Sequence, residues 1–151
     1  ITPISPFKQA NKLTNYYTRF KIINNYCKKN SKIICSDVEF NLKPPYNTSD
    51  TLMHLNKEFP KTDFKIILGE DNLNTLHSWS NHELILEHKI CVYPRKSLSK
   101  EKSKLINHPN VNLYNAPIME ISSTLIRKNI LEKTSISHLV PKEIEEMLIE
   151  K

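Results

Sequence analysis

Short apolar runs that alternate with segments of helical period are the feature that most restricts the fold of this chain. Three runs have the length and β-branched content of buried strands: DFKIILGED at 63–71, ICVYP at 90–94 and VNLYNAP at 111–117. Before them, apolar residues recur at three- and four-residue steps, as in amphipathic helices, around 13–29 and 47–59. Between the first two runs, NLNTLHSWSNHELILEHK at 72–89 predicts one broken helix or two short ones. This alternation is typical of βαβ units, so we expect an α/β protein with a parallel sheet.

The rest of the chain adds less regular elements. KIICSDVEF at 32–40 predicts a further short strand, and the opening ITPISPFK resembles the end of a strand entering a proline-rich loop. A helix is expected from about residue 122 and a last one from Pro141. The lysine- and serine-rich stretch 96–110 is predicted to be a loop, a candidate for a lid.

Length and composition indicate a soluble protein of one domain, spanning 1–151. The chain has 151 residues, and its longest apolar stretches are strand-sized, far below the ~20 residues of a membrane span. Cys27, Cys35 and Cys91 are an odd number of cysteines with no C-x-x-C pair, which favours reduced thiols and a cytoplasmic location. No secretory signal pattern opens the chain.

The net charge of +6 favours an anionic partner, which could be nucleic acid, an acidic membrane surface or a phosphorylated small molecule. The lysines are scattered rather than clustered. A nucleic-acid-binding domain needs a contiguous cationic face with interleaved aromatic residues, whereas Tyr16, Tyr17 and Tyr26 fall at positions expected in a helix core. We therefore expect neither a nucleic acid nor a membrane as the partner.

Polar residues of specific kinds follow the predicted strands. Lys8 follows the opening strand, Gly69 and Asp71 follow FKIIL, and Arg95 follows ICVY. Gly69 is the only glycine in the chain, which indicates a position whose local geometry favours glycine. Ligands of open parallel sheets bind outside the carboxyl ends of the strands, so these residues predict a binding site.

The stretch EISSTLIRKN, residues 120–129, predicts a phosphate site. Free N–H groups and the positive end of the helix dipole attract anions, and the hydroxyls of Ser122, Ser123 and Thr124 add donors. Arg127 lies one turn later and can donate to the same phosphate. Three hydroxyls before a helix are more often an ordinary cap, but their agreement with the other strand ends favours a ligand site.

Several motifs in order resemble the nicotinate-mononucleotide adenylyltransferases of the nucleotidyltransferase superfamily. ISSTLIR at 121–127 is similar to their ISSTxIR phosphate motif, and LGED followed by LHSW resembles their G-x-D…W segment. Weaker matches are VYPR, SPFK, TSDTL and HLVP, each in the expected order. The resemblance covers essentially all of the chain. It implies a Rossmann-like parallel sheet with flanking helices, and transfer of AMP from ATP to nicotinate mononucleotide, giving deamido-NAD and pyrophosphate.

The resemblance also assigns roles to residues. The ATP phosphates are expected to contact Ser122, Ser123, Thr124 and Arg127, with Lys8 and Arg95 nearby. Gly69 and Asp71 are expected at the nucleotide, with Asp71 on ribose hydroxyls. Trp79 is expected to stack on the pyridine ring, with Thr48 near its carboxylate. Mg²⁺ is expected to arrive on the ATP phosphates. The sequence predicts no metal site made by the protein, because its histidines lack H-E-x-x-H or paired Cys spacing.

Most of these residues also have a structural interpretation. Trp79 could anchor a helix on the core, and Asp71 could be the N-cap of the next helix. Lys8 and Arg95 could be solvated surface charges. Asn47 precedes Thr48 where the family usually has Tyr, which weakens the assignment of the substrate more than that of the reaction.

The family's glycine-rich first turn with its His-x-Gly-His pair is absent, so the catalytic residues are unknown. Because the chain opens on Ile1 rather than Met, we expect that the natural N-terminus and the first strand-helix unit, ~30 residues, are missing. The alternatives are an inactive remnant of the enzyme, a related phosphopantetheine adenylyl- or cytidylyltransferase and, least favoured, a basic nucleic-acid-binding domain. The sequence leaves open the oligomeric state and the choice between nicotinate and nicotinamide mononucleotide.

Overall fold

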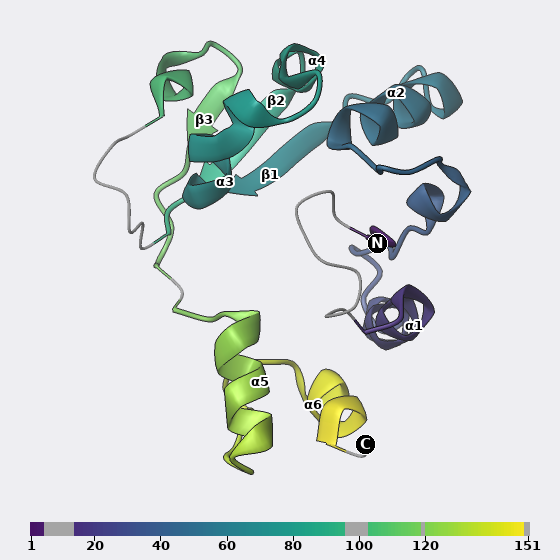
Figure 1. Ribbon diagram of the computed structural model, residues 1–151, viewed down its shortest axis with the longest axis vertical. Coiled ribbons are helices and arrows are strands. Elements are labelled where there is room, and N and C mark those ends of the chain that lie inside the picture. The colour runs from purple at the N-terminus through teal and green to yellow at the C-terminus, as the bar shows by residue number, and fades with distance from the viewer. Residues whose placement is uncertain (5–13, 96–102, 119, 150–151) are drawn as a thin grey trace. The chain divides into compact units, whose positions relative to one another are not determined.

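The computed structural model describes residues 1–4, 14–95, 103–118 and 120–149 (Figure 1). The chain forms two compact units. Unit 1 consists of Ile1–Tyr46 and Ile121–Lys151, and unit 2 consists of Asn47–Glu120.

Unit 2 contains a parallel three-stranded sheet in the order β1-β2-β3. Its strands are β1 (Lys65–Gly69), β2 (Lys89–Tyr93) and β3 (Val111–Leu113). The register aligns Ile66 with Ile90 and Ile90 with Val111, so apolar side chains of all three strands share one face. Because all strands run in the same direction, their carboxyl ends lie at one edge of the sheet, where ligands of such sheets bind.

Helices cover the apolar face of this sheet. They are α2 (Thr48–Glu58), α3 (Glu70–Thr75) and α4 (His82–Leu86), with short 3₁₀ turns at Leu76–Ser78 and Lys104–Asn107. Leu73, Leu76 and Ile85 from these segments are at most 1% exposed and pack with Ile90. Ile67, which follows Ile66 in β1, lies on the other face of the sheet and is 75% exposed. The core of unit 2 therefore lies on one side of its sheet.

Unit 1 is helical in its described part. Its helices are α1 (Tyr16–Cys27), α5 (Ser123–Leu131) and α6 (Lys142–Ile149), with a 3₁₀ turn at Val38–Asn41. Phe40 of that turn packs edge-on against rings of α1, with its centroid 4.8 Å from that of Tyr16. Ile136, which follows α5, is completely buried.

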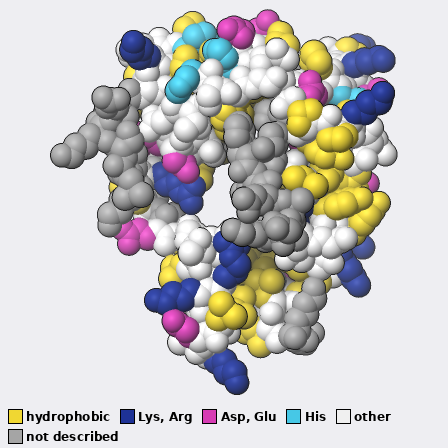
Figure 2. Space-filling view, in the orientation of Figure 1, with side chains coloured by type: hydrophobic (Ala, Val, Ile, Leu, Met, Phe, Trp, Pro, Cys, Tyr) yellow, Lys and Arg dark blue, Asp and Glu magenta, His cyan; other side chains and the backbone are white. Residues whose placement is uncertain are grey.

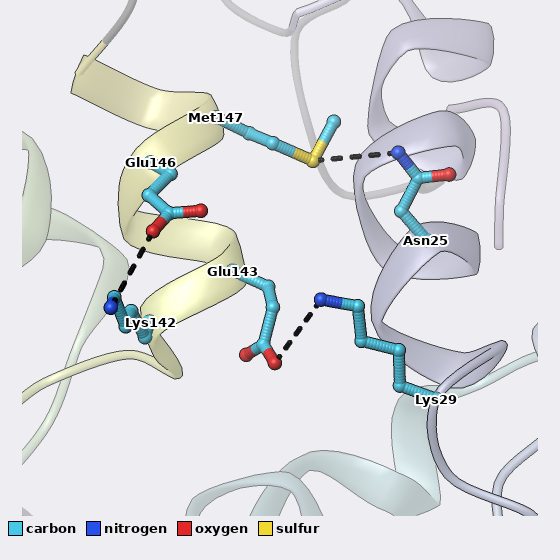
Figure 3. Close-up of polar contacts among 6 residues, drawn as sticks. All are labelled: Asn25, Lys29, Lys142, Glu143, Glu146 and Met147. Carbon is cyan, nitrogen blue, oxygen red and sulfur yellow. Dashed lines mark hydrogen bonds and ion pairs between the residues drawn. The ribbon is translucent and has the colours of Figure 1, made fainter.

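Helices α1 and α6 are joined by two polar contacts although they lie at opposite ends of the chain (Figure 3). The Asn25 amide donates to the Met147 sulfur at 3.7 Å, and the Lys29 Nζ lies 3.5 Å from the Glu143 Oε1. The hydrogen bond from its own backbone N–H, followed by the positive charge of Lys29, holds the pKa of Glu143 below its ordinary value. These contacts fix the C-terminal helix onto the N-terminal one.

The predicted α/β class and parallel sheet are confirmed, as are the predicted helices and the strands of unit 2. The strand predicted at 32–40 is wrong: this segment contains a turn followed by the 3₁₀ turn at Val38–Asn41. Ile34 in this segment is 89% exposed, so it does not pack against a neighbouring strand. Strand formation depends on side-chain packing against such a neighbour more than on local sequence. Residues 1–4 are likewise not in a strand.

The three cysteines are free thiols. Cys27 is buried, while Cys35 and Cys91 are half-buried, and desolvation is the largest of several influences that raise the pKa of the Cys35 thiol. No helix among the described residues is both long and apolar enough to cross a bilayer.

Candidate functional site

The motif that predicts a phosphate site forms the start of α5 in unit 1. Ser122 is the N-cap, with extended φ and ψ of −139° and 152°, and its Oγ accepts a hydrogen bond from the Leu125 N–H at 3.1 Å. The Ser122 carbonyl accepts the first helical hydrogen bond, from the Ile126 N–H. The cap interpretation of Ser122 is thus correct, and it leaves the hydroxyl hydrogen able to donate elsewhere.

The remaining groups of the motif form an exposed strip at the beginning of α5. Ser123, Thr124 and Arg127 are all exposed, and spacings of three and four residues place them on the same side of the helix. Their side chains and the N–H groups of Ser123 and Thr124 have no hydrogen-bond partner in the part of the chain that the structure describes. The positive end of this nine-residue helix therefore presents free N–H groups, hydroxyls and a cation. Such a combination of groups is suited to an anion.

The second group of predicted residues lies at the carboxyl ends of β1 and β2 in unit 2. Asp71 is in the first turn of α3, directly after β1, and Arg95 follows β2. The Arg95 Nη1 donates to the Asp71 Oδ2 at 2.9 Å, so the sheet register brings together two side chains that are 24 positions apart. Gly69 is the N-cap of α3, which corrects the alternative that Asp71 has this position.

Gly69 is surrounded by side chains on the side where a Cβ would project. That Cβ would collide with the Asp71 Oδ1 and would lie 3.3 Å from the Tyr93 hydroxyl oxygen. The φ of Gly69 is −77°, which any residue can adopt, so backbone conformation does not require glycine here. A Cβ at this position would therefore displace the Asp71 carboxylate, which is the far end of an exposed side chain, and would crowd the Tyr93 ring.

A pocket of about 290 Å³ opens at the same edge of the sheet. Its lining comes from all three strand ends: Glu70, Val92, Tyr93, Pro94, Leu113, Tyr114 and Asn115. The Cys91 thiol donates to the Tyr114 hydroxyl at 3.7 Å, and this contact raises the pKa of Tyr114, which keeps the phenol neutral. Sequence reasoning did not name Tyr93 or Tyr114, although each stands at or just after a strand end, which was the available signal.

The residues predicted to bind the pyridine substrate lie elsewhere in unit 2. Thr48 is half-buried at the first position of α2, whose N-cap is Asn47. The Asn47 Nδ2 donates to the Asp50 Oδ2 at 3.0 Å. Trp79 is half-buried and packs against the core of unit 2, as expected of a residue that anchors a helix. Neither observation tests a role in substrate binding.

Three further predictions concern Lys8, metal binding and the distribution of positive charge. Lys8 lies outside the described residues, so its role stays a prediction. Among the described residues, no group of three or more His, Cys, Asp or Glu side chains could hold a metal ion. Within each unit, on the face drawn in Figure 2, the Lys and Arg side chains stand singly or in small groups.

The fold and these residues define an α/β protein with an exposed cationic helix start in unit 1 and polar side chains at the strand ends of unit 2. No family model matches the chain. A protein of Flavobacterium psychrophilum named "Probable nicotinate-nucleotide adenylyltransferase" is 43% identical over 145 residues, covering 95% of this chain and 75% of that protein. A protein of the same name from Cytophaga hutchinsonii is 41% identical over 150 residues, covering 99% and 77%. The chain therefore belongs to the nicotinate-nucleotide adenylyltransferase family.

Solved structures agree with this assignment. The nicotinic acid mononucleotide adenylyltransferase of Plasmodium falciparum complexed with APC is 26% identical, with a TM-score of 0.68 over 91% of this chain and 75% of that one. The same enzyme complexed with NaAD superposes with a TM-score of 0.71 over 97% of this chain and 78% of that one. The latter pair is 22% identical and supports the fold alone. The predicted Rossmann-like fold is thus confirmed.

Proposed function

We propose that this protein transfers the adenylyl group of ATP to nicotinate mononucleotide, forming deamido-NAD and pyrophosphate. Membership of the family supports the reaction. The observation in the structure that carries the proposal is the start of α5, where exposed hydroxyls, free N–H groups and Arg127 converge on one side of a helix end. This arrangement suits the triphosphate of ATP, which is the anionic substrate of the reaction.

The chemistry requires no covalent intermediate. A phosphate oxygen of nicotinate mononucleotide attacks the α-phosphorus of ATP in line, forming a new P–O bond. The bond between the α-phosphorus and the bridging oxygen of the β-phosphate breaks, and pyrophosphate leaves with that electron pair. The protein contributes orientation of the two substrates and stabilisation of the charge that moves onto the leaving group.

Four residues of unit 1 are proposed to bind the phosphates of ATP. Ser122, Ser123 and Thr124 donate hydroxyl hydrogens, and Arg127 supplies a full positive charge one turn later. The Ser122 hydroxyl can do this while its oxygen caps the helix. Mg²⁺ would enter bound to the ATP phosphates, as part of the substrate, and would neutralise part of their charge. Lys8 is proposed to lie near the same phosphates, as the family motif implies.

Unit 2 is proposed to bind the nucleoside and pyridine parts of the substrates. The Asp71 carboxylate accepts from ribose hydroxyls, and it lies at the sheet edge where ligands of parallel sheets bind. The half-buried Trp79 presents part of its indole to the pyridine ring, and Thr48, at the start of α2, lies near the pyridine carboxylate.

We further propose that the two units act as one nucleotidyltransferase domain, because the relatives match across both. The free thiols favour a cytoplasmic location.

Pyrophosphate release tests this proposal. Protein purified from its own cells is incubated with ATP, Mg²⁺ and one acceptor from a panel of nicotinate mononucleotide, nicotinamide mononucleotide and 4′-phosphopantetheine. We expect release with nicotinate mononucleotide, and mass spectrometry should identify deamido-NAD. Release only with 4′-phosphopantetheine would show that the reaction class is right and the substrate wrong. If none of the three acceptors supports release of pyrophosphate, the proposal is refuted.

The Arg127 role has a matched control on the same helix. Arg127→Ala should lower kcat/KM at least about tenfold, the loss expected when a charge-assisted hydrogen bond is removed. Lys128→Ala removes the same charge one position further along, where the side chain is 66% exposed and lies 3.9 Å from the Glu132 carboxylate. Lys128→Ala should leave kcat/KM unchanged. Equal losses in both variants would indicate a general charge effect and contradict a specific role for Arg127.

A further inference from the structure

The Asp71 carboxylate presents its two oxygens to different surroundings. The Arg95 Nη1 donates to Oδ2 at 2.9 Å, a short distance typical of a charge-assisted hydrogen bond. Oδ1 lies over the Cα of Gly69 and has no hydrogen-bond partner among the residues that the structure describes. One oxygen is therefore fixed by a cation, while the other remains able to accept.

This arrangement changes what Arg95 can offer to a phosphate. Its charge is compensated by Asp71 at 2.9 Å, whereas Arg127 has no acidic partner among the described residues. An ion pair with no net charge attracts a phosphate more weakly than a lone guanidinium does. The family motif implies that Arg95 acts near the ATP phosphates, but its geometry in this chain directs it to the carboxylate.

We propose that Arg95 is a positioning residue, which holds the Asp71 carboxylate by Oδ2 so that Oδ1 is oriented to accept from the ribose hydroxyls of a bound nucleotide. The inference rests on the proposed function, in which Asp71 contacts the ribose. Arg95 therefore contributes to nucleotide affinity through Asp71 and has little direct contribution from a phosphate contact.

The surroundings of the pair support this role. Asp71 and Arg95 have side chains that are 45% and 36% exposed, so neither is held by burial. An aspartate on the surface samples several rotamers unless a partner selects one. The guanidinium selects the rotamer on one side, and the space above Gly69, bounded by the Tyr93 hydroxyl, admits Oδ1 on the other. The sole glycine and Arg95 thus serve the same carboxylate orientation.

A double-mutant cycle on nucleotide binding tests the proposal. Dissociation constants for ATP and for nicotinate mononucleotide are measured by calorimetry for the wild-type protein, Asp71→Ala, Arg95→Ala and the double variant. Asp71→Ala should weaken binding of one nucleotide about tenfold, the loss of a hydrogen bond to a charged acceptor. Arg95→Ala should weaken the same nucleotide about threefold, within the range of an exposed ion pair.

The double variant decides between the two roles of Arg95. If Arg95 acts through Asp71, the double variant binds as weakly as Asp71→Ala alone, because the carboxylate to be positioned is gone. If Arg95 contacts a phosphate directly, the two factors multiply, and the proposal is overturned. Steady-state kinetics add a second criterion: Arg95→Ala should raise the KM of that nucleotide and leave kcat unchanged. A fall in kcat with KM unchanged would also overturn it.

A nucleotide-free measurement separates this inference from the proposed function. Three-bond NMR couplings to the Asp71 β-protons should indicate one χ1 rotamer in the wild-type protein and rotamer averaging in Arg95→Ala. Averaging in the wild-type protein would refute the positioning role even if the enzyme is active. Absence of adenylyl transfer together with a single Arg95-dependent rotamer would refute the proposed function instead. Lys142→Ala, which breaks an exposed 4.0 Å pair with Glu146 on α6, is the control and should change none of these values.

Discussion

The Ser122 hydroxyl is assigned two roles, as helix cap and as phosphate donor, and an aspartate at this position separates them. In Ser122→Asp a carboxylate oxygen can replace Oγ as acceptor for the Leu125 N–H, now bonded at 3.1 Å. Aspartate is as good an N-cap as serine, and its charge favours the positive end of the helix dipole. The stability of the protein should therefore be retained.

Binding of ATP should respond in the opposite direction. Two unit charges about 4 Å apart repel by about 1 kcal/mol in water and by about 4 kcal/mol at the effective dielectric constant near a protein surface. The new carboxylate would face the phosphates across roughly that distance, so ATP affinity should fall at least about fivefold by the lower of these values. Ser122→Ala is the complement: it loses the cap, at a cost of about 1 kcal/mol in the free energy of unfolding.

The assay combines urea denaturation with calorimetric titration of Mg²⁺-ATP on the wild-type protein and both variants. The expected pattern is a stable Ser122→Asp that binds ATP weakly, and a less stable Ser122→Ala that loses less affinity. Unchanged ATP affinity in Ser122→Asp would show that no phosphate approaches this helix end. That result would reduce the motif to an ordinary cap.

Three further predictions concern other parts of the chain. Gly69→Ala should lower nucleotide affinity in calorimetry, with little change in the circular dichroism spectrum, because the new Cβ displaces the Asp71 carboxylate; unchanged affinity would contradict the steric account. Ile90→Ala should lower the free energy of unfolding, measured in urea, by about 2–5 kcal/mol, because the Ile90 side chain is completely buried. A loss of less than about 1 kcal/mol would contradict the central place of Ile90 in the core. Glu143 has a lowered pKa in the folded protein, so its ionised form adds stability at higher pH that is lost as the pH falls through the lowered pKa, below the ordinary 4.5. Glu143→Gln should flatten the pH dependence of stability in that acid range, and an unchanged slope would show that neither its backbone hydrogen bond nor its contact with Lys29 contributes.

The sheet of unit 2 could be predicted because its strands are continuous apolar runs. Such a run favours a strand of a parallel sheet, because these strands need apolar contacts with their neighbours and with the helices that cover them. The segment 32–40 has a similar composition yet forms no strand, and Ile34 in it is 89% exposed. Composition alone could not show that this run lacks a partner strand, because pairing depends on residues distant in sequence.

The site shows the same division between local and distant information. The cap by Ser122 is a contact between residues three positions apart and could be predicted from the motif. The hydrogen bond between Asp71 and Arg95 joins residues 24 positions apart and depends on the register of β1 with β2. The sequence identified both residues as candidates, but only the structure shows that they contact each other and that Gly69 accommodates one of them.

The identity of the reaction product tests the central claim most directly. Protein purified from its own cells is supplied with Mg²⁺, nicotinate mononucleotide and ATP labelled at the α-phosphate, and the products are separated by chromatography and identified by mass. The account predicts that the label appears in deamido-NAD, with one pyrophosphate released for each molecule formed. Label that remains in ATP, or that appears only in AMP by hydrolysis, would contradict it.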